Sequence, residues 1–409
     1  MENKEILLKS LQANKYYTNT DLRMNRNYGF LLSNEQLNDY LDYKEIADNE
    51  NRIDLPLVSW NSKKIFIYNS KQLNSLINEY VEYFFEDVSS HKSVYTQRNY
   101  NEVLFGIVCS ELEGTLKIEG VNTTRRQIET IIKENNPKDK NERIIVNMMK
   151  GLEYIAKTKS FEKDTLKELY DILSDDCLDP DDVIGSSHYR NDVVYVSEHT
   201  GCPTNKIDEC MDSLFEYVNA TLKSKKVYER FLLPFIVHYY ILYIHPYFDY
   251  NGRTARMVQL WIFMLLGDIS PLYLSEAIND HKNDYYKAID STRYSRNDLS
   301  YFVIYLVELK NSYSLVQKNL EGIKEDIESS GETISEKELH YLKKIIINKN
   351  VKWFNYKKFI EFENLDITKQ GALKILNGFV ELGLIDSKIN SKNEKIFILN
   401  ENILKYELD

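Results

Sequence analysis

Twelve consecutive residues, 245–256, carry the side chains of this sequence that are best suited to chemistry. His245 can act as a general base near neutral pH, and Asp249 can hold a divalent metal ion. Arg253 and Arg256 lie three residues apart, so they share one helical face, and their guanidinium groups suit phosphate oxygens. A base, a metal carboxylate and an anion site in one short segment indicate the transfer of a phosphate-containing group.

Two apolar stretches flank this segment and predict the helices that hold it in place. Residues 231–244 and 257–266 are typical of buried helices, because apolar side chains occupy nearly every position. Pro246 disfavours the helical conformation at the residue before it, so the first helix is expected to end at His245.

The residues between the two helices predict a tight loop that can receive an anion. Asn251 and Gly252 suit positive φ angles, so the second helix should begin near Gly252 or Arg253. The free N–H groups and the dipole of that helix then face the loop, and both favour a bound anion.

The whole segment resembles the signature of the Fic family, His-Pro-Phe-x-Asp/Glu-Gly-Asn-Gly-Arg-x-x-Arg. Seven of the nine specified positions match, with no gap. Tyr247 replaces the usual phenylalanine, and Tyr250 replaces the usual first glycine. The resemblance is specific, because uncommon residues stand at fixed spacing between two helices.

The resemblance implies an autoinhibited protein adenylyltransferase, which moves AMP from ATP to a Ser, Thr or Tyr hydroxyl of a target protein. His245 would be the catalytic base, and Asp249 would hold Mg²⁺ against the phosphates. The implied nucleotide-binding residues are Asn251, Gly252, Arg253 and Arg256. Asn251 would steady either the phosphates or the loop, and Arg256 would reach the γ-phosphate.

Tyr250 is where the segment departs furthest from the signature. A tyrosine there would either narrow the anion loop or point to solvent while its N–H still faces phosphate. The first arrangement would change the choice of nucleotide or abolish transfer, so transfer of another nucleotide or phosphate-containing group stays an alternative. Kinase activity is disfavoured, because the Doc branch of the family carries lysine where Gly252 stands.

Upstream, residues 115–120 resemble the inhibitory motif of the same family, Ser/Thr-x-x-x-Glu-Gly/Asn. Thr115 and Glu119 are four residues apart and share a helical face, and Gly120 follows them. A second Glu-Gly pair begins at Glu113, but Cys109 occupies its Ser/Thr position, so the Glu119 register is preferred.

The resemblance implies a mechanism of inhibition by charge. A Glu119 carboxylate paired with Arg256 would occupy the guanidinium that a γ-phosphate needs, and it would also repel the triphosphate. The place of the motif before the catalytic segment matches the subclass with an N-terminal inhibitory helix.

A weaker resemblance covers the segment from Gly185 onward, which is similar to the hairpin, or flap, that aligns the target in Fic proteins. The expected strand consists of Val193, Val194, Tyr195 and Val196. Strand addition would hold a target peptide through its backbone, although an ordinary surface hairpin is nearly as good an interpretation. Segments 275–278 and 284–286 resemble the following helix of the family and receive no role.

The composition bounds the class of protein. A net charge of −11 over 409 residues argues against a protein that coats nucleic acid broadly. The four cysteines form no Cys-x-x-Cys pair, and the N-terminus lacks the features of a signal peptide. We therefore expect a cytoplasmic protein with reduced thiols and no membrane partner.

The predicted fold is mainly α, a Fic-type helical core with a short β-hairpin flap followed by a C-terminal winged helix-turn-helix domain. The expected divisions are an N-terminal region that the sequence does not place, the Fic core with its inhibitory helix, a helical connector and the winged helix, at 1–95, 96–310, 311–331 and 332–409. The helices expected in the core before the catalytic segment are 102–119, 125–134, 142–158, 163–173 and 205–222.

The C-terminal module is nearly neutral, because residues 331–409 hold 13 lysines, no arginine and 12 acidic residues. A DNA reader more often has a clear basic face, so protein contact or dimer packing is favoured over DNA, roughly two to one. A homo-oligomer therefore stays open as a partner state. A DNA-binding regulator whose core senses nucleotide without transfer is the alternative from a different class.

Overall fold

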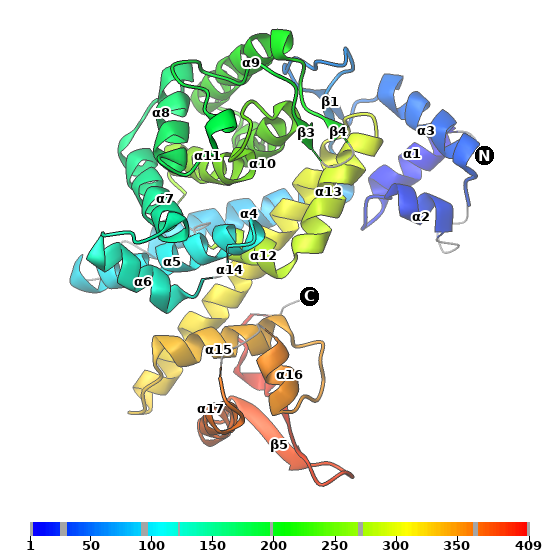
Figure 1. Cartoon of the computed structure of the whole chain (residues 1–409). Coiled ribbons are helices and arrows are strands. Elements are labelled where there is room, and N and C mark those ends of the chain that lie inside the picture. The colour runs from blue at the N-terminus through cyan, green and yellow to red at the C-terminus, as the bar shows by residue number, and fades with distance from the viewer. Residues whose placement is uncertain are drawn as a thin grey trace. The chain divides into compact units, whose positions relative to one another are not determined.

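The structure is a computed structural model that describes residues 3–24, 31–90, 97–121, 123–196, 199–268, 273–362 and 367–406. The described part is mainly helical, as predicted (Figure 1). The chain divides into two compact units, Met1–Asn311 and Ser312–Asp409. Among the described helices, none combines the length and the apolar character needed to cross a membrane.

The N-terminal region folds as three helices, a two-stranded hairpin and a long fourth helix. Their bounds are α1 Asn3–Gln12, α2 Asn19–Met24, α3 Asn34–Ile46, β1 Arg52–Asp54, β2 Phe66–Tyr68 and α4 Lys71–Ser90. This region belongs to the first unit rather than forming a unit of its own. Phe66 is joined to the end of that unit, because its N–H donates to Asn297 and its carbonyl accepts from Leu299.

A buried ion pair joins the N-terminal region to the residues just before α14 (Ser300–Ser329). Lys44 Nζ lies 2.5 Å from Asp298 Oδ2, and both side chains are almost wholly buried. The Tyr16 hydroxyl donates to Asp298 at 2.8 Å, and Lys44 donates to the Tyr301 hydroxyl at 3.0 Å. The rings of Tyr16 and Tyr301 each lie 4.7 Å from the ammonium group, so the charge is surrounded by compatible groups.

The rest of the first unit is a helical core with one small hairpin. Its elements are α5 Gln97–Ile118, α6 Arg125–Glu134, α7 Lys140–Lys157, α8 Lys163–Ser174, η2 Pro180–Asp182, β3 Tyr195–Val196, β4 His199–Thr200, α9 Thr204–Lys223, α10 Val227–Ile244, α11 Asn251–Leu266, α12 Leu274–Asp280 and α13 Lys282–Tyr294. The five helices predicted before the catalytic segment match α5 to α9 within a few residues at each end.

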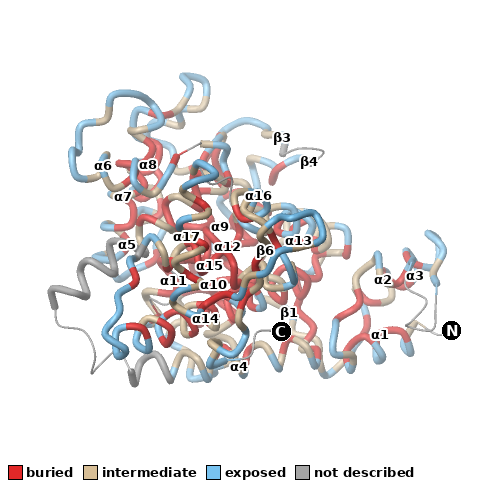
Figure 2. The backbone as a smooth tube through the Cα atoms, turned by 90° about the horizontal axis from the view of Figure 1, so that it is seen from below, coloured by how far each residue is buried: buried red, intermediate tan, exposed pale blue. Residues whose placement is uncertain are grey.

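Helices α10 and α11 pack against each other at the centre of this unit. α9 covers α10, whereas α7 and α8 pack on α11 (Figure 1). Most residues of both helices are buried, which agrees with their continuous apolar sequence (Figure 2). Residues 245–250 therefore connect two helices that other helices of the first unit pack against on several sides.

The helix α14 is one element, Ser300–Ser329, although the sequence predicted a core helix and a separate helical connector. The division between the two units falls inside it, after Asn311. Its later turns supply Val316, Leu320 and Ile323 to the core of the second unit, so the expected connector is part of that unit.

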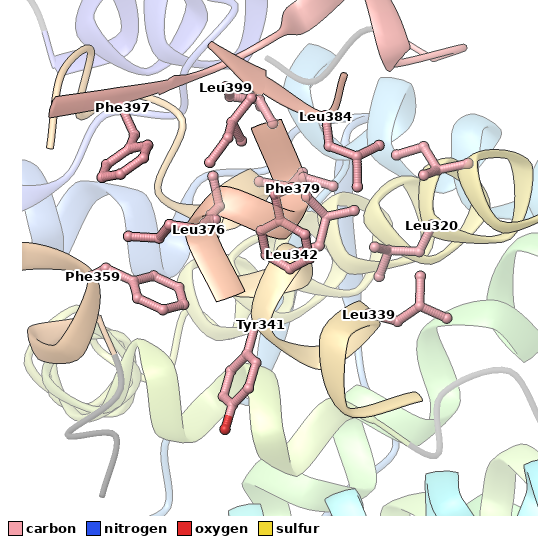
Figure 3. Packing of buried hydrophobic residues seen from close by; sticks show 14 of the residues in the cluster. Leu320, Leu339, Tyr341, Leu342, Phe359, Leu376, Phe379, Leu384, Phe397 and Leu399 are labelled. Atoms are coloured by element: carbon pink, nitrogen blue, oxygen red, sulfur yellow. The ribbon is translucent and has the colours of Figure 1, made fainter. Parts of the chain in front are cut away.

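The second unit adds three helices and a hairpin, namely α15 Glu336–Ile347, α16 Tyr356–Glu361, α17 Lys369–Glu381, β5 Ile385–Ile389 and β6 Lys395–Leu399, with a final turn η3 Glu401–Ile403. Its core brings Phe359, Leu376, Phe379 and Phe397 together (Figure 3). Thr368 caps α17 as predicted, because its Oγ1 accepts from the Gly371 N–H. The order of elements agrees with the predicted outline, and a winged helix-turn-helix stays our interpretation.

We predict that Asp298→Ala destabilises the first unit strongly, because it leaves the Lys44 ammonium buried without its carboxylate. The expected loss in the free energy of unfolding is about 3–5 kcal/mol, measured by urea denaturation with tryptophan fluorescence. Glu209→Ala is the matched control, since it removes a carboxylate from an exposed pair with Lys206 and should leave the free energy of unfolding nearly unchanged. Equal losses in the two variants would contradict the prediction.

Candidate active site

The helix α10 ends at His245, as the following proline predicts. His245 has φ 54° and ψ 62°, the left-handed conformation, and its N–H donates to Ile241 at the end of the helix. The Nδ1 atom is buried and has no hydrogen-bond partner among the described residues. The chain thus reverses at the residue that carries the candidate base.

Arg190, which sequence reasoning did not single out, holds this turn from outside. Its Nε donates to the His245 carbonyl at 2.8 Å, and its backbone N–H donates to Pro246 at 3.0 Å. Further guanidinium bonds reach the carbonyls of Asp192 and Cys202. Arg190 is buried, and its side chain donates to the backbone carbonyls of three residues, so no charge pattern in the sequence could have revealed its role.

The positive φ angle expected at Asn251 or Gly252 lies instead at Tyr250, with φ 67°. The helix α11 begins at Asn251, and Gly252 is helical, so the expectation about these two residues was wrong. Asn251 is held in the helix because its side chain bonds twice to Tyr247, at 3.0 Å to the N–H and 2.8 Å to the carbonyl. Both amide groups are used, which favours the loop-steadying role over phosphate contact.

Gly252 has a different reason to be glycine. An added Cβ atom there would lie 2.7 Å from Glu119 Oε1 and 3.3 Å from Arg256 Nη1. The missing side chain therefore leaves room for the carboxylate from α5 at the first turn of α11.

Arg256 is buried and is bound by both polar residues of the predicted inhibitory motif. Its Nε donates to Thr115 Oγ1 at 2.8 Å, and its Nη2 donates to Glu119 Oε1 at 2.5 Å. The competing Glu113 pairs with Lys117 on its own helix instead. The structure thus places Thr115 and Glu119, the preferred register of the motif, in contact with Arg256. The inhibitory role of Glu119 stays a prediction.

The end of α5 explains why a glycine follows Glu119. Gly120 has φ +80° and ends the helix, and the Val121 N–H returns to the Leu116 carbonyl. Lys282 donates to the Ile118 carbonyl, which satisfies another group at this helix end. Glu119 is consequently the first residue past the helix, and its side chain is 28% exposed.

The charges around this contact reinforce one another. Burial raises the pKa of Glu119, but Arg256, Arg253 and Lys282 outweigh it, so the pKa lies below its ordinary value. Burial likewise lowers the pKa of Arg256, and the Glu119 carboxylate more than reverses this. Both groups are therefore charged at neutral pH.

Asp249 and Arg253 lie at the mouth of the turn. The Asp249 side chain is 51% exposed, and its two oxygens lie 3.4 Å from Arg253 Nη2, a long contact. One of them also accepts from the Tyr250 N–H. Tyr250, the N-cap residue of α11, makes no side-chain capping bond, so the first N–H groups of the helix can receive an anion beside this pair.

The predicted flap is a hairpin of β3 and β4, with Tyr195 opposite Thr200. Val193 and Tyr195 are exposed, Val194 is half-buried, and the side chain of Val196 lies outside the described part. The Gly201 N–H donates to the Val194 carbonyl within the hairpin, and the Cys202 N–H that follows it donates to the Ile244 carbonyl at the end of α10. The end of the hairpin therefore lies next to the turn at His245.

Comparison with known proteins gives the family of this region. Residues 160–263 match the family model described as the Fic/DOC family, and they include His245 and the first turns of α11. The chain therefore carries a Fic/DOC domain, as the sequence resemblance predicted. The division into subclasses stays a prediction.

The protein adenylyltransferase Fic of Nematostella vectensis is 26% identical over 118 residues, which make up 27% of this chain and 26% of that protein. The chain thus spans about a quarter of that relative. A Fic family protein from Desulfovibrio desulfuricans aligns with a TM-score of 0.49 and 16% identity, over 81% of this chain and 96% of that one. Fic-1 from C. elegans gives a TM-score of 0.46 and 19% identity, over 62% and 72%.

We predict that His245 titrates well below an ordinary histidine. Burial lowers its pKa to about 4, with the Arg190 charge acting in the same direction and the Leu242 backbone against it. Neutral His245 therefore persists to about pH 4, and its contribution to stability is full above pH 6.5 and is lost as the pH falls toward 4. NMR titration of the His245 imidazole signal, assigned by its loss in His245→Gln, should give a midpoint near pH 4. A midpoint near pH 6.5 would contradict the burial of this imidazole.

Proposed function

We propose that this protein is an autoinhibited protein adenylyltransferase that transfers AMP from ATP to a hydroxyl group of a target protein. The observation that carries the proposal is the meeting of three groups at one turn. His245 ends α10, the Tyr250 side chain makes no capping bond at the N-terminus of α11, and the buried Arg256 guanidinium lies beside Gly252 in the first turn of that helix. The Fic/DOC match to residues 160–263 and the adenylyltransferase relative support this reading.

In the proposed reaction, neutral His245 accepts the proton of the target hydroxyl. The hydroxyl oxygen then forms a bond to the α-phosphorus of ATP, while the bond from that phosphorus to the bridging oxygen breaks and pyrophosphate leaves. A triphosphate bound at α11 places negative charge near His245, which raises the pKa of the imidazole toward the working pH. Arg253 and Arg256 would neutralise the phosphates that depart.

Asp249 suits Mg²⁺, because its carboxylate is half exposed and its contacts to the Arg253 guanidinium are long, while one oxygen also accepts from the Tyr250 N–H. Within the described ranges, no three His, Cys, Asp or Glu side chains form a metal cluster. Mg²⁺ would therefore take one carboxylate, and its other ligands would be phosphate oxygens and water. When bound, the ion would neutralise charge on the phosphates.

Autoinhibition follows from competition for Arg256. A γ-phosphate can use this guanidinium only after Glu119 has moved, because Nη2 already donates to that carboxylate. The space over Gly252 that a triphosphate would need is also filled by Glu119 Oε1. Release of α5, or removal of the carboxylate, should therefore activate the enzyme.

Glu119→Gly is expected to increase AMP transfer by on the order of 10- to 100-fold, the range that a coupling of about 1–3 kcal/mol gives. His245→Ala in the same background should lower the rate by on the order of 10²–10⁴-fold. Intact-mass analysis of each variant after incubation with ATP and Mg²⁺, alone and with cell lysate, measures both effects.

Glu113→Gln is the matched control, because it removes a carboxylate from the same helix without touching Arg256. Its transfer rate should equal that of the wild type. Equal signals in wild type, Glu119→Gly and His245→Ala would refute the proposal. Repeating the incubation with each nucleoside triphosphate identifies the transferred group by its added mass, and a mass other than AMP would replace adenylylation by the alternative transfer.

Asp249→Asn in the Glu119→Gly background should weaken the response to the metal ion, because the amide keeps the size but loses the charge. We expect the Mg²⁺ concentration at half-maximal rate to rise by about ten-fold or more. An unchanged Mg²⁺ titration would remove Asp249 from the proposed metal site.

A further inference from the structure

Tyr250 adopts a backbone conformation that disfavours its own side chain. Its φ of 67° and ψ of 6° are left-handed, where a residue with a Cβ atom is strained and glycine is not. The residue is 2% exposed, so the expected arrangement in which the side chain points to solvent is wrong, whereas a narrower anion loop stays a prediction. A strained, buried tyrosine at the start of α11 calls for a compensating interaction.

That interaction is with Arg253. The guanidinium carbon lies 3.4 Å from the centre of the Tyr250 ring, a distance typical of stacking. Arg253 has few other contacts, because its bonds to Asp249 are 3.4 Å long and its Nε is buried without a partner among the described residues. The Tyr250 ring therefore packs directly against this guanidinium, whose hydrogen bonds among the described residues are the long ones to Asp249.

The contact involves the ring face and a neutral phenol. Burial raises the pKa of the Tyr250 hydroxyl well above its ordinary value, so the residue stays protonated at neutral pH. The hydroxyl has no hydrogen-bond partner of normal geometry in the described structure. The interaction is thus cation–π stacking, which phenylalanine could provide and an aliphatic residue could not.

We propose that Tyr250 is a positioning residue that fixes the Arg253 guanidinium at the first turn of α11 for binding to nucleotide phosphates. This inference rests on the proposed function, because that function assigns Arg253 to phosphate. A glycine at position 250 would relieve the backbone but would leave Arg253 held only by Asp249. The tyrosine therefore supplies a rigid wall on one side of the anion site.

The test compares Tyr250→Phe with Tyr250→Leu, both in the Glu119→Gly background. Phenylalanine keeps the ring, whereas leucine keeps most of the bulk and the same backbone strain but lacks a π face. The first readout is the Arg253 Nε–H resonance in arginine-labelled protein without nucleotide, assigned with Arg253→Lys. We expect a ring-current shift and slow hydrogen exchange with Tyr or Phe, and loss of both with Leu.

The second readout is steady-state transfer at varied ATP. The KM for ATP should rise about 3- to 30-fold in Tyr250→Leu with little change in kcat, because a phosphate contact made before and during the reaction affects binding most. Tyr250→Phe should match the parent. If leucine fails to fold by circular dichroism, Tyr250→Met takes its place.

Each outcome separates the two proposals. An unshifted Arg253 resonance in the parent, or a KM that is equal in the Leu and Phe variants, overturns the positioning role while the proposed function stands. A shifted resonance that disappears only with Leu supports the role, even if no variant transfers or binds ATP. In that case the proposed function fails, while the positioning of Arg253 by the Tyr250 ring stands.

Discussion

The short connection between α10 and α11 constrains everything around it. Two helices that are largely buried are joined by only six residues, 245–250, with left-handed residues at both ends, His245 and Tyr250. A buried helix end must satisfy its backbone groups. The carbonyls at the end of α10 accept from Arg190 and Cys202, whereas no side chain caps the facing N-terminus of α11. The turn is therefore fixed on its carbonyl side and open to an anion on its N–H side.

The buried charge of Arg256 connects the candidate site with the end of α5. A buried arginine such as Arg256 needs an anionic partner, since an unpaired buried charge is strongly destabilising. In this structure Glu119 provides that partner and Thr115 a further bond. A nucleotide phosphate would satisfy the same requirement, so under the proposed function the contact that stabilises the fold would also be the one that the nucleotide displaces. Gly252 gives either anion the room to approach.

Patterns within one helix or one short segment were predictable. The ends of α10 and α17 follow from local rules about proline and glycine. The Glu119 register came from the family resemblance, and the positive φ angle expected at Asn251 or Gly252 lies at Tyr250. The N-terminal region was not predictable, because its packing depends on contacts such as Lys44 with Asp298 that join distant parts of the chain. The role of Arg190 was not predictable for a related reason. Its side chain bonds to backbone oxygens, which every residue has, so the identity of its partners carries no signal in the sequence.

The sequence by itself determined which residues could do chemistry, because a spacing of 3.6 residues per turn decides which side chains of one helix share a face. The pairing of the two motifs came from the resemblance to the Fic family. Only the tertiary structure decided how the polar groups divide among themselves. Asn251 is used up by the loop, Arg256 is bound by α5, and the Tyr250 ring is turned inward beneath Arg253. These assignments depend on distances between separate elements, which the order of residues does not contain.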